Sequence, residues 1–414
     1  MKRKLDDQAK IFSLSFNKKY TAIFRITVKL LDKIDKKYLD QAATRTMKTY
    51  KDFRVKLQKG FLWHYLEENN NPLPTHEGIK YNFTKVNTQD NNGHLIKISY
   101  QEDEIALDFF HLLTDGTTAR EFTKELLYNY LRLCNHKLKP QKKLTINSEN
   151  AYLKYYTNEH SNLQLSPQSY QLKGEYIPSK EVSFNDFHIN LNELKRLSKE
   201  KECSLSILLI SLISYSLYET NYKKHNGTKP INLCIPVNLK NYFVTDTITN
   251  FVSHFVLSIL PIEVKTFNDM IDLVKQEYTD KMVEEKIKNT FEANGKLINN
   301  KVFNLIPLVI KRPLINLCSL IVKRQFTMTI SNLGPIEIEE EYSNYIDNII
   351  VRLLPDWAER TKCAISTYKD DLIISFGSNL LDTGLESKFQ ELLDNLNVTY
   401  STKNNKVNPI KKDS

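Results

Sequence analysis

The chain has 414 residues, of which 41% are hydrophobic and 11% aromatic, a length and composition that suggest two folded domains with substantial cores. Over half of its net charge of +9 lies in the first ten and last fourteen residues, and no basic stripe is interleaved with aromatic residues, which argues against nucleic-acid binding. No run of eighteen apolar residues occurs, so we expect no transmembrane segment.

The cysteines, the histidines and the N-terminus favour a cytoplasmic protein without a metal site. The five cysteines are scattered and include no Cys-x-x-Cys pair, which argues against a disulfide framework or a zinc site. The nine histidines form no His-x-x-x-His or Glu-x-x-His pair, so we predict no bound metal. The first seven residues are basic and then acidic and lack the apolar core of a signal peptide.

The first part of the chain shows strand and helix periodicities in a clear order. They predict strands over residues 21–30, 94–100 and 104–111 and a helix over residues 35–50. The next helix follows Gly116 and ends near Cys134. Thr118 and Glu121 form a capping-box pattern near its start. The strand that ends at His111 therefore runs directly into a turn and a helix.

Residues 135–178 are polar, irregular and interrupted by prolines, and we interpret them as the crossover between two halves of the chain. The second half resumes a regular pattern. It predicts helices over residues 190–199, 204–222, 267–288 and 386–396, and strands over residues 182–189, 231–237, 251–264, 326–330, 349–354, 362–368 and 372–377. Asn294-Gly295 predicts a break in the chain.

Residues 301–323 form an apolar segment that we expect to be helical and to kink or divide at Pro307 and Pro313. Its composition would suit contact with a membrane surface. We expect core packing or channel lining instead, because an apolar segment of a chain this size more often serves a core.

The residues most suited to chemistry stand where the strand over residues 104–111 ends. His111 continues the face of Ile105, Leu107 and Phe109, and Asp115 follows it by four residues. Of the nine histidines, only His111 is followed by Asp at the fourth position. An imidazole titrates near neutral pH, so it can take a proton from an alcohol or thiol and return it.

The turn itself leaves two arrangements open. Asp115 could accept a hydrogen bond from the imidazole, or it could turn away and pair with an arginine that fixes the turn. Gly116 allows the backbone geometry that a tight strand-to-helix turn can need. A histidine at a strand end is more often a structural residue than a catalytic one, so the motif needs support from other segments.

Two further segments give that support through a family resemblance. His-x-x-x-Asp-Gly on a strand-to-helix turn resembles the chloramphenicol acetyltransferase-like superfamily, which includes alcohol acyltransferases, polyketide-associated acyltransferases and non-ribosomal condensation enzymes. Downstream, the chain resembles bacterial alcohol acetyltransferase-like proteins in Ile235-Pro236-Val237-Asn238-Leu239-Lys240, followed by Thr247-Ile248-Thr249-Asn250-Phe251, and in Thr329-Ile330-Ser331-Asn332-Leu333-Gly334. The resemblance spans about residues 10 to 400.

The chain also departs from patterns within that superfamily. Many condensation enzymes carry a second His just before the catalytic one, where this chain has Phe110, and this favours alcohol acyl transfer over peptide-bond condensation. The Asp-Phe-Gly-Trp-Gly signature of the plant enzymes is absent, and Ser331-Asn332-Leu333-Gly334 is the segment we place in a comparable position. Lys240 stands where the pattern suggests Arg.

The resemblance implies an α/β fold of two chloramphenicol acetyltransferase-like sandwich domains, with mixed sheets and a channel between them. Residues 1–178 would form the N-terminal half, which carries the His111 motif and includes the crossover. Residues 179–414 would form the C-terminal half, which carries the Ser331–Gly334 turn.

The resemblance also implies an activity, in which an acyl group moves from acyl-CoA to a small alcohol with His111 as general base. Asp115 would point away from the substrate and pair with an arginine, for which Arg25 is our candidate. The tetrahedral oxyanion needs a hydrogen-bond donor, and Ser331 and Asn332 are candidates, although Ser-Asn-x-Gly is also ordinary turn chemistry. We predict no bound cofactor, with acyl-CoA as co-substrate, and no Gly-rich phosphate loop is present.

Two alternatives stay open at this stage. The chain could be a condensation-type enzyme that takes its acyl group from a carrier-protein thioester, so an acyl-carrier protein is a second possible partner. It could also be a catalytically silent binding or scaffold protein with the same fold. The intact set of His111, Asp115 and Gly116 argues against the silent protein.

Overall fold

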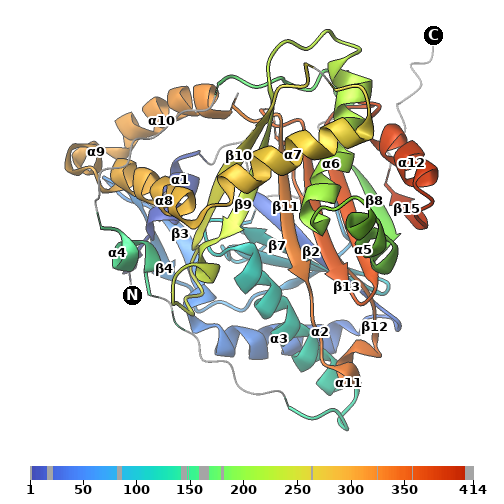
Figure 1. Cartoon of the computed structure of the whole chain (residues 1–414). Helices are drawn as coiled ribbons and strands as arrows, with labels where there is room; N and C mark the ends of the chain where they lie inside the picture. The colour runs from blue at the N-terminus through green and yellow to red at the C-terminus, as the bar shows by residue number, and fades with distance from the viewer. Residues whose placement is uncertain are drawn as a thin grey trace, which may run out of the picture.

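The computed structural model shows three β-sheets and the helices that cover them (Figure 1). It describes residues 2–15, 22–81, 86–140, 147, 149–157, 167–178, 181–262, 264–323, 325–356 and 358–405. The predicted crossover over residues 135–178 lies partly outside these described residues.

The first large sheet has five strands in the order β12-β2-β7-β6-β5 and is mixed, because β5 runs parallel to β6 while the other pairs are antiparallel. Its strands are β2 (Ile23–Leu30), β5 (Thr75–Glu77), β6 (Ile96–Gln101), β7 (Glu104–Phe110) and β12 (Ile346–Leu353). Helices α2 (Lys36–Thr49) and α3 (Gly116–Cys134) pack against each other and share a core with this sheet. The predicted strands and helices of this part are confirmed to within a few residues.

The second large sheet has seven strands in the order β10-β9-β11-β13-β14-β8-β15, and it is also mixed, because β11 runs parallel to both neighbours. Its strands are β8 (Ser183–Asn190), β9 (Ile231–Asn238), β10 (Val252–Ile259), β11 (Met328–Pro335), β13 (Thr361–Tyr368), β14 (Asp371–Ser378) and β15 (Tyr400–Asn404). One face packs on α5 (Leu191–Glu200), α6 (Leu205–Leu217), α7 (Phe267–Lys281) and α12 (Leu385–Asn395).

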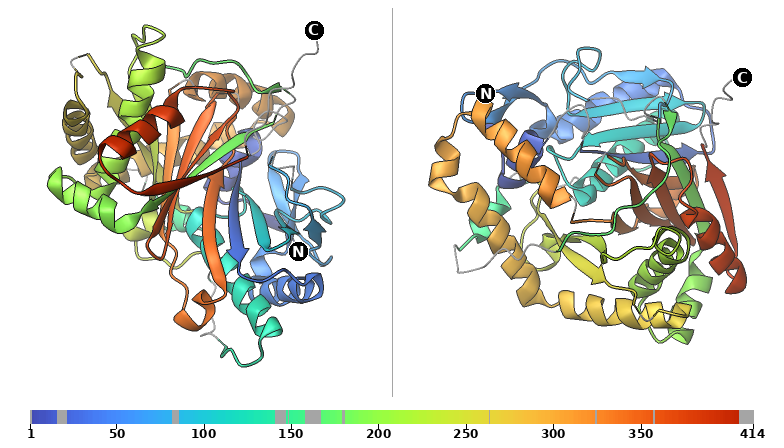
Figure 2. Two further views of the ribbon diagram at one scale, coloured as in Figure 1. Left: turned by 90° about the vertical axis from the view of Figure 1, so that its right-hand side faces the viewer. Right: turned by 90° about the horizontal axis from the view of Figure 1, so that it is seen from above.

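The two sheets meet because β12 comes from the second half of the chain but pairs along β2 in the first sheet (Figure 2). A buried ion pair reinforces the junction: Arg352 on β12 contacts Asp186 on β8, with 2.5 Å between nitrogen and oxygen. Ser375 donates to the same carboxylate at 2.6 Å. The two sheets therefore do not correspond one to one with the two halves of the sequence, and the division near residue 178 stays a prediction.

The remaining elements form a layer at one end of the molecule. A small sheet of β1 (Lys2–Lys4), β4 (His64–Glu68) and β3 (Val55–Lys59) lies in the order β1-β4-β3. The helices of this layer are α1 (Asp7–Ser15), α4 (Ala151–Tyr155), α8 (Glu284–Asn299), α9 (Lys301–Leu305) and α10 (Leu308–Lys323). Helix α11 (Glu340–Ser343) is the exception and lies beside β12 and α3. Helix α1 packs against α8 and α10.

Three local predictions are wrong. Gly295 lies inside α8 rather than at a break, because a single glycine costs a helix only about 1 kcal/mol relative to alanine. The helix predicted over residues 267–288 is two helices, α7 and α8, that are separated at Met282 and Val283. The strand predicted over residues 326–330 continues as β11 to Pro335, because a bulge absorbs the turn-like residues.

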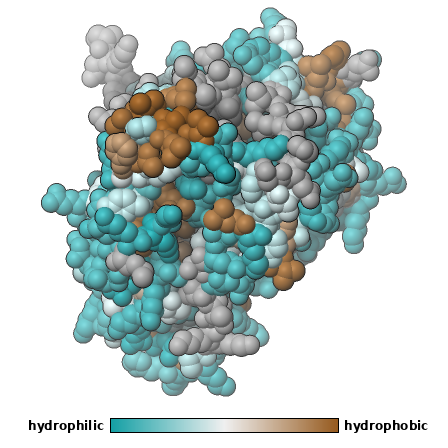
Figure 3. All heavy atoms as spheres, turned by 90° about the vertical axis from the view of Figure 1, so that its left-hand side faces the viewer, coloured by the Kyte–Doolittle hydropathy of each residue, from teal (hydrophilic) through white to brown (hydrophobic). Residues whose placement is uncertain are grey.

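The expected core packing of residues 301–323 is wrong for several of the side chains that the structure describes, and the alternative of channel lining stays a prediction. Leu308 and Lys311 face inward, and Val302, Leu305, Val309 and Ile310 are exposed. Figure 3 shows an apolar cluster on the face of the molecule that carries these helices. No single helix among the described residues is long and apolar enough to cross a membrane; α5 and α6 pass that test only together, across a bend of 90°.

Candidate active site at the His111 turn

His111 lies just beyond β7, where the chain turns toward α3. Its backbone N–H donates to the carbonyl of Ala22 at 2.8 Å, which extends the pairing of β7 with β2. The imidazole stacks on Phe12 of α1 with ring centroids 4.6 Å apart and meets the edge of Phe24 at 5.2 Å. The ring is therefore clamped between two aromatic side chains, which is the rigid mounting that a catalytic base needs.

Asn250 fixes the tautomer of this imidazole, that is, which of its two ring nitrogens carries the proton. The amide nitrogen of Asn250 donates to the carbonyls of His111 at 2.8 Å and Leu112 at 3.3 Å. Its amide oxygen must then face Nδ1 of His111, which lies 3.1 Å away. Because an amide oxygen only accepts, Nδ1 carries the proton and Nε2 keeps a free lone pair.

Burial lowers the pKa of His111 below its ordinary value of 6.5. The hydrogen bond to its own backbone carbonyl, the negative charge of Asp115 and the contact with Asn250 oppose this shift, and the positive charge of Lys362 adds to it. The imidazole is consequently neutral at pH 7, with Nε2 able to accept a proton.

Asp115 turns away from the imidazole and begins helix α3. It is fully buried and caps the helix by accepting from the N–H of Thr118 at 2.9 Å. Its other oxygen accepts from the N–H of Phe251 at 3.3 Å and lies 3.0 Å from the ammonium of Lys240. The predicted capping box is therefore wrong, because the helix begins at Gly116, two residues before Thr118, and uses Asp115 as its cap.

The expected arginine partner is also wrong. Arg25 forms a buried two-point pair with Asp108 on the neighbouring strand, at 2.6 and 2.8 Å. Lys240 takes the place that the family pattern gives to an arginine, and its ammonium also donates to the hydroxyl of Thr118 at 3.0 Å. A cation from the second half of the chain thus neutralises the buried carboxylate of the first half.

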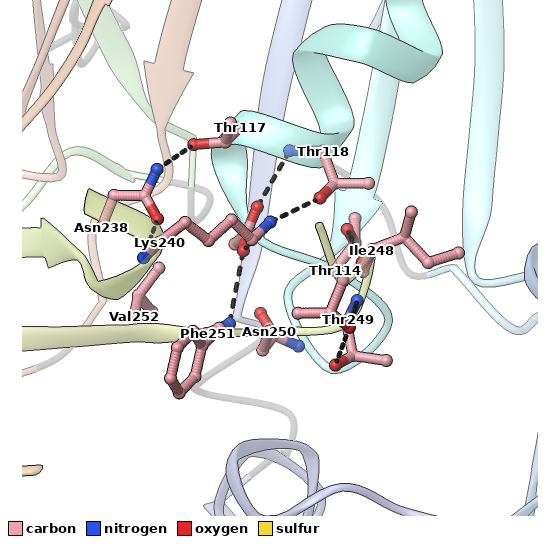
Figure 4. A network of polar contacts seen from close by, with 12 residues as sticks. Thr114, Thr117, Thr118, Asn238, Lys240, Ile248, Thr249, Asn250, Phe251 and Val252 are labelled. Carbon is pink, nitrogen blue, oxygen red and sulfur yellow. Dashed lines mark hydrogen bonds and ion pairs between the residues drawn. The ribbon is translucent and has the colours of Figure 1, made fainter. Parts of the chain in front are cut away.

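Further contacts from residues 235–240 and 247–251, which carry part of the family resemblance, hold the same turn (Figure 4). The hydroxyl of Thr114 donates to the carbonyl of Ile248 at 3.0 Å, and the amide of Asn238 donates to the hydroxyl of Thr117 at 3.2 Å. We call the contacts of residues 238–251 with residues 111–118 the polar latch. This latch fixes both the imidazole of His111 and the start of α3.

Gly116 serves close approach rather than unusual backbone geometry. It is the first residue of α3 and is not among the glycines with positive φ. A Cβ built on it would lie 3.0 Å from Cδ1 of Leu333 on β11. The absence of a side chain at Gly116 lets the Ser331–Gly334 segment approach the His111 turn.

The two candidate oxyanion donors differ in their surroundings. Ser331 pairs with Ala364 of β13, whose side chain belongs to the core of the first sheet, so Ser331 faces the sheet that carries His111. Asn332 is exposed, and its side-chain oxygen accepts from the N–H of Gly334 at 2.9 Å. Gly334 has a φ of +73°, which the β-bulge requires and glycine permits.

A charged cluster lies on the same face of the second sheet as Ser331. Lys362 contacts Asp356 at 2.9 Å and Glu359 at 3.1 Å, and Glu359 accepts from the hydroxyl of Thr329 at 2.7 Å. These residues and Asn250 are the parts of the site that sequence reasoning missed. Asn250 lies in the segment over residues 247–251 that carries the family resemblance, but only folding brings it to His111. Among the described residues, no group of three or more His, Cys, Asp or Glu side chains could hold a metal ion.

No family model and no curated protein matches this sequence. Solved structures match its fold over nearly its whole length. Polyketide synthase associated protein 5 from Mycobacterium tuberculosis is 13% identical, with a TM-score of 0.63, and the match covers 94% of this chain and 96% of that one. This chain has the condensation-type fold.

Two other structures support that assignment. TRI101 of F. graminearum, complexed with coenzyme A and deoxynivalenol, is 8% identical, with a TM-score of 0.67 and coverage of 97% and 99%. The epimerization domain of tyrocidine synthetase B is 13% identical, with a TM-score of 0.60 and 96% coverage of each chain. The predicted α/β fold of the chloramphenicol acetyltransferase-like type, with mixed sheets, is confirmed.

Proposed function

We propose that this chain is an acyltransferase that moves an acyl group from acyl-CoA to an alcohol, with His111 as general base. The observation that carries the proposal is the orientation of Asn250. Its amide holds the proton on Nδ1 of His111 and leaves Nε2 as the acceptor. The ring is also held between Phe12 and Phe24 at the end of β7, so the orientation of Nε2 is fixed as well.

The reaction follows from that geometry. Nε2 takes the hydroxyl proton of the acceptor as the hydroxyl oxygen attacks the thioester carbonyl carbon. A C–O bond forms, the tetrahedral intermediate collapses and the C–S bond breaks. The imidazolium returns its proton to the departing thiolate, so the products are an ester and free coenzyme A. Asp115 acts as a positioning residue, because its oxygens are occupied by Thr118, Phe251 and Lys240.

Ser331 is the donor that we propose for the oxyanion. It lies on the face of β11 that looks toward the first sheet, and Leu333 brings the same segment to the start of α3. A donor held on a strand is already oriented before charge develops on the carbonyl oxygen. We assign Asn332 the separate task of fixing the bulge through Gly334.

Coenzyme A is the acyl carrier that we favour. TRI101, a structure of the same fold, was solved with coenzyme A bound, and Phe110 replaces the second His of many condensation enzymes. A carrier-protein donor is the second candidate, because condensation and epimerization domains of peptide synthetases share this fold as well.

The test measures thiol release from acetyl-CoA and longer acyl-CoAs across a panel of alcohols, with the mass of each ester product confirmed. We expect ester formation with at least one alcohol and none with His111→Ala. The same panel with acyl-pantetheine on a carrier protein separates the second candidate. A folded protein that releases no thiol from either donor would contradict the proposal and favour a silent binding protein.

A further inference from the structure

The surface formed by α9, α10 and the loop that precedes β4 is unusually apolar for an exposed face. We call it the α9–α10 surface. Its exposed apolar side chains, with the exposed fraction of each, are Phe61 (78%), Val302 (73%), Leu305 (72%), Val309 (67%), Ile310 (59%) and Leu314 (45%). Figure 3 shows apolar side chains gathered in one cluster on this face. Contiguous apolar patches of this kind mark sites of interaction with a protein or a membrane.

This exposure is a consequence of how the helix is anchored. Leu308 is buried, and its N–H donates to the carbonyl of Phe61 at 2.8 Å. The ammonium of Lys311 lies 3.5 Å from the centre of the Trp63 ring and donates to the carbonyl of Leu62 at 3.0 Å. The inward face of α10 thus holds Leu308 and a lysine, while Val309, Ile310 and Leu314 face outward.

The charge of residues 301–324 indicates which kind of partner this surface binds. Residues 301–324 contain five basic residues and no acidic residue. Lys59 and Lys301 are exposed beside the apolar side chains, and Lys59 lines a cavity of about 280 Å³ together with Val309 and Arg312. Aliphatic side chains flanked by lysine and arginine match the interface of a bilayer with anionic headgroups.

We propose that the α9–α10 surface binds the surface of an anionic lipid bilayer, with the exposed apolar side chains at the headgroup boundary and the exposed Lys59 and Lys301 on lipid phosphates. A second copy of this chain is the poorer partner, because a twofold interface would place each patch against its own equivalent. The exposed Lys59 and Lys301 of one copy would then be brought toward the same positive charges of the other.

The position of the surface relative to the candidate site gives this binding a consequence. Helix α10 packs against α1, and Phe12 of α1 stacks on His111. A bilayer bound at α9 and α10 would therefore lie one helix away from the imidazole. This arrangement suits an acceptor or an acyl chain that resides in the lipid.

The test uses the full chain and vesicles of phosphatidylcholine with and without phosphatidylserine, in a sedimentation assay. We expect wild-type protein to bind the vesicles that contain phosphatidylserine more tightly. Leu305→Glu should weaken that binding at least about tenfold. Ile262→Glu is the matched control, because Ile262 is 76% exposed and lies outside the surface, and it should bind as wild type does.

A second pair of variants tests the charge. Lys301→Ala should weaken binding to the anionic vesicles about fivefold. Lys33→Ala changes an exposed lysine that lies outside the α9–α10 surface, and it should leave binding unchanged. The proposal is overturned if wild type binds neither vesicle, if both glutamate variants lose binding equally, or if light scattering shows a dimer that Leu305→Glu dissociates. Vesicle binding needs no catalysis, so its outcome is independent of the proposed acyl transfer.

Discussion

The His111 turn and the Ser331–Gly334 bulge are the two polar segments of the candidate site, and they are held in different ways. The turn depends on distant parts of the chain, because Lys240 and Asn250 supply the contacts that fix Asp115 and His111. The bulge depends on its neighbours in the sheet and on its own residues, because β11 pairs with β13 and Asn332 accepts from the N–H of Gly334.

This difference matches what a general base and an oxyanion donor each need from the fold. A general base needs one tautomer and one ring orientation, and side-chain hydrogen bonds from elsewhere in the fold can impose both. A hydrogen-bond donor for an oxyanion needs only a fixed direction, which strand geometry provides. Damage to the latch should therefore alter acid–base behaviour and stability, while damage to the bulge should alter turnover alone.

The largest effect should come from His111→Ala. Loss of the general base should lower turnover about a hundredfold to ten-thousandfold while the protein stays folded. Turnover is measured with the best acyl-CoA and alcohol pair, and the folded state by thermal melting. A folded variant with wild-type turnover would remove His111 from the mechanism.

Ser331→Ala should have the next largest effect. Loss of one oxyanion donor costs about 3 kcal/mol of transition-state stabilisation, a loss of about a hundredfold in kcat with little change in KM for the acyl donor. Asn332→Ala is the matched control and should lower kcat much less, because its side-chain oxygen is occupied within the bulge. Equal effects of the two changes would show that the bulge acts as a unit, and normal turnover of the double variant would exclude both donors.

Lys240→Met should lower the stability of the protein, because it removes the cation of the polar latch. It leaves the fully buried Asp115 carboxylate without its cation, which should lower the free energy of unfolding by about 3 to 5 kcal/mol in urea titrations. Lys240→Arg keeps the charge and should retain most of the stability. Lys36→Met, which breaks the exposed pair with Asp40, should change little. If Lys240→Met is as stable as wild type, the pair does not hold the turn.

Asn250→Ala should give the smallest effect on rate but a diagnostic change with pH. Loss of the tautomer control should lower turnover about fivefold, in line with one hydrogen bond of about 1 kcal/mol. Burial already lowers the pKa of His111, so wild-type activity should fall only below pH 6.5. The contact with Asn250 raises that pKa, so its removal should move the acidic limb to still lower pH. A limb that moves to higher pH would contradict the assigned tautomer.

The sequence alone determined most of the local elements and singled out His111 as the candidate base. Alternation in residues 104–111, followed by helical spacing after Gly116, placed His111 at a strand end, because these periodicities arise from the backbone geometry of neighbouring residues. The family resemblance of three short segments then pointed to the fold, and the structural matches confirmed it.

Tertiary structure alone decided which groups meet. Lys240 rather than Arg25 neutralises Asp115, Asn250 orients His111, and β12 joins the sheet of the other half. It also decided that Val302, Leu305 and Val309 face outward, since amphipathic spacing does not say which face of a helix packs on a core. Contacts between residues far apart in sequence depend on how the whole chain packs, and no local pattern of residues records them.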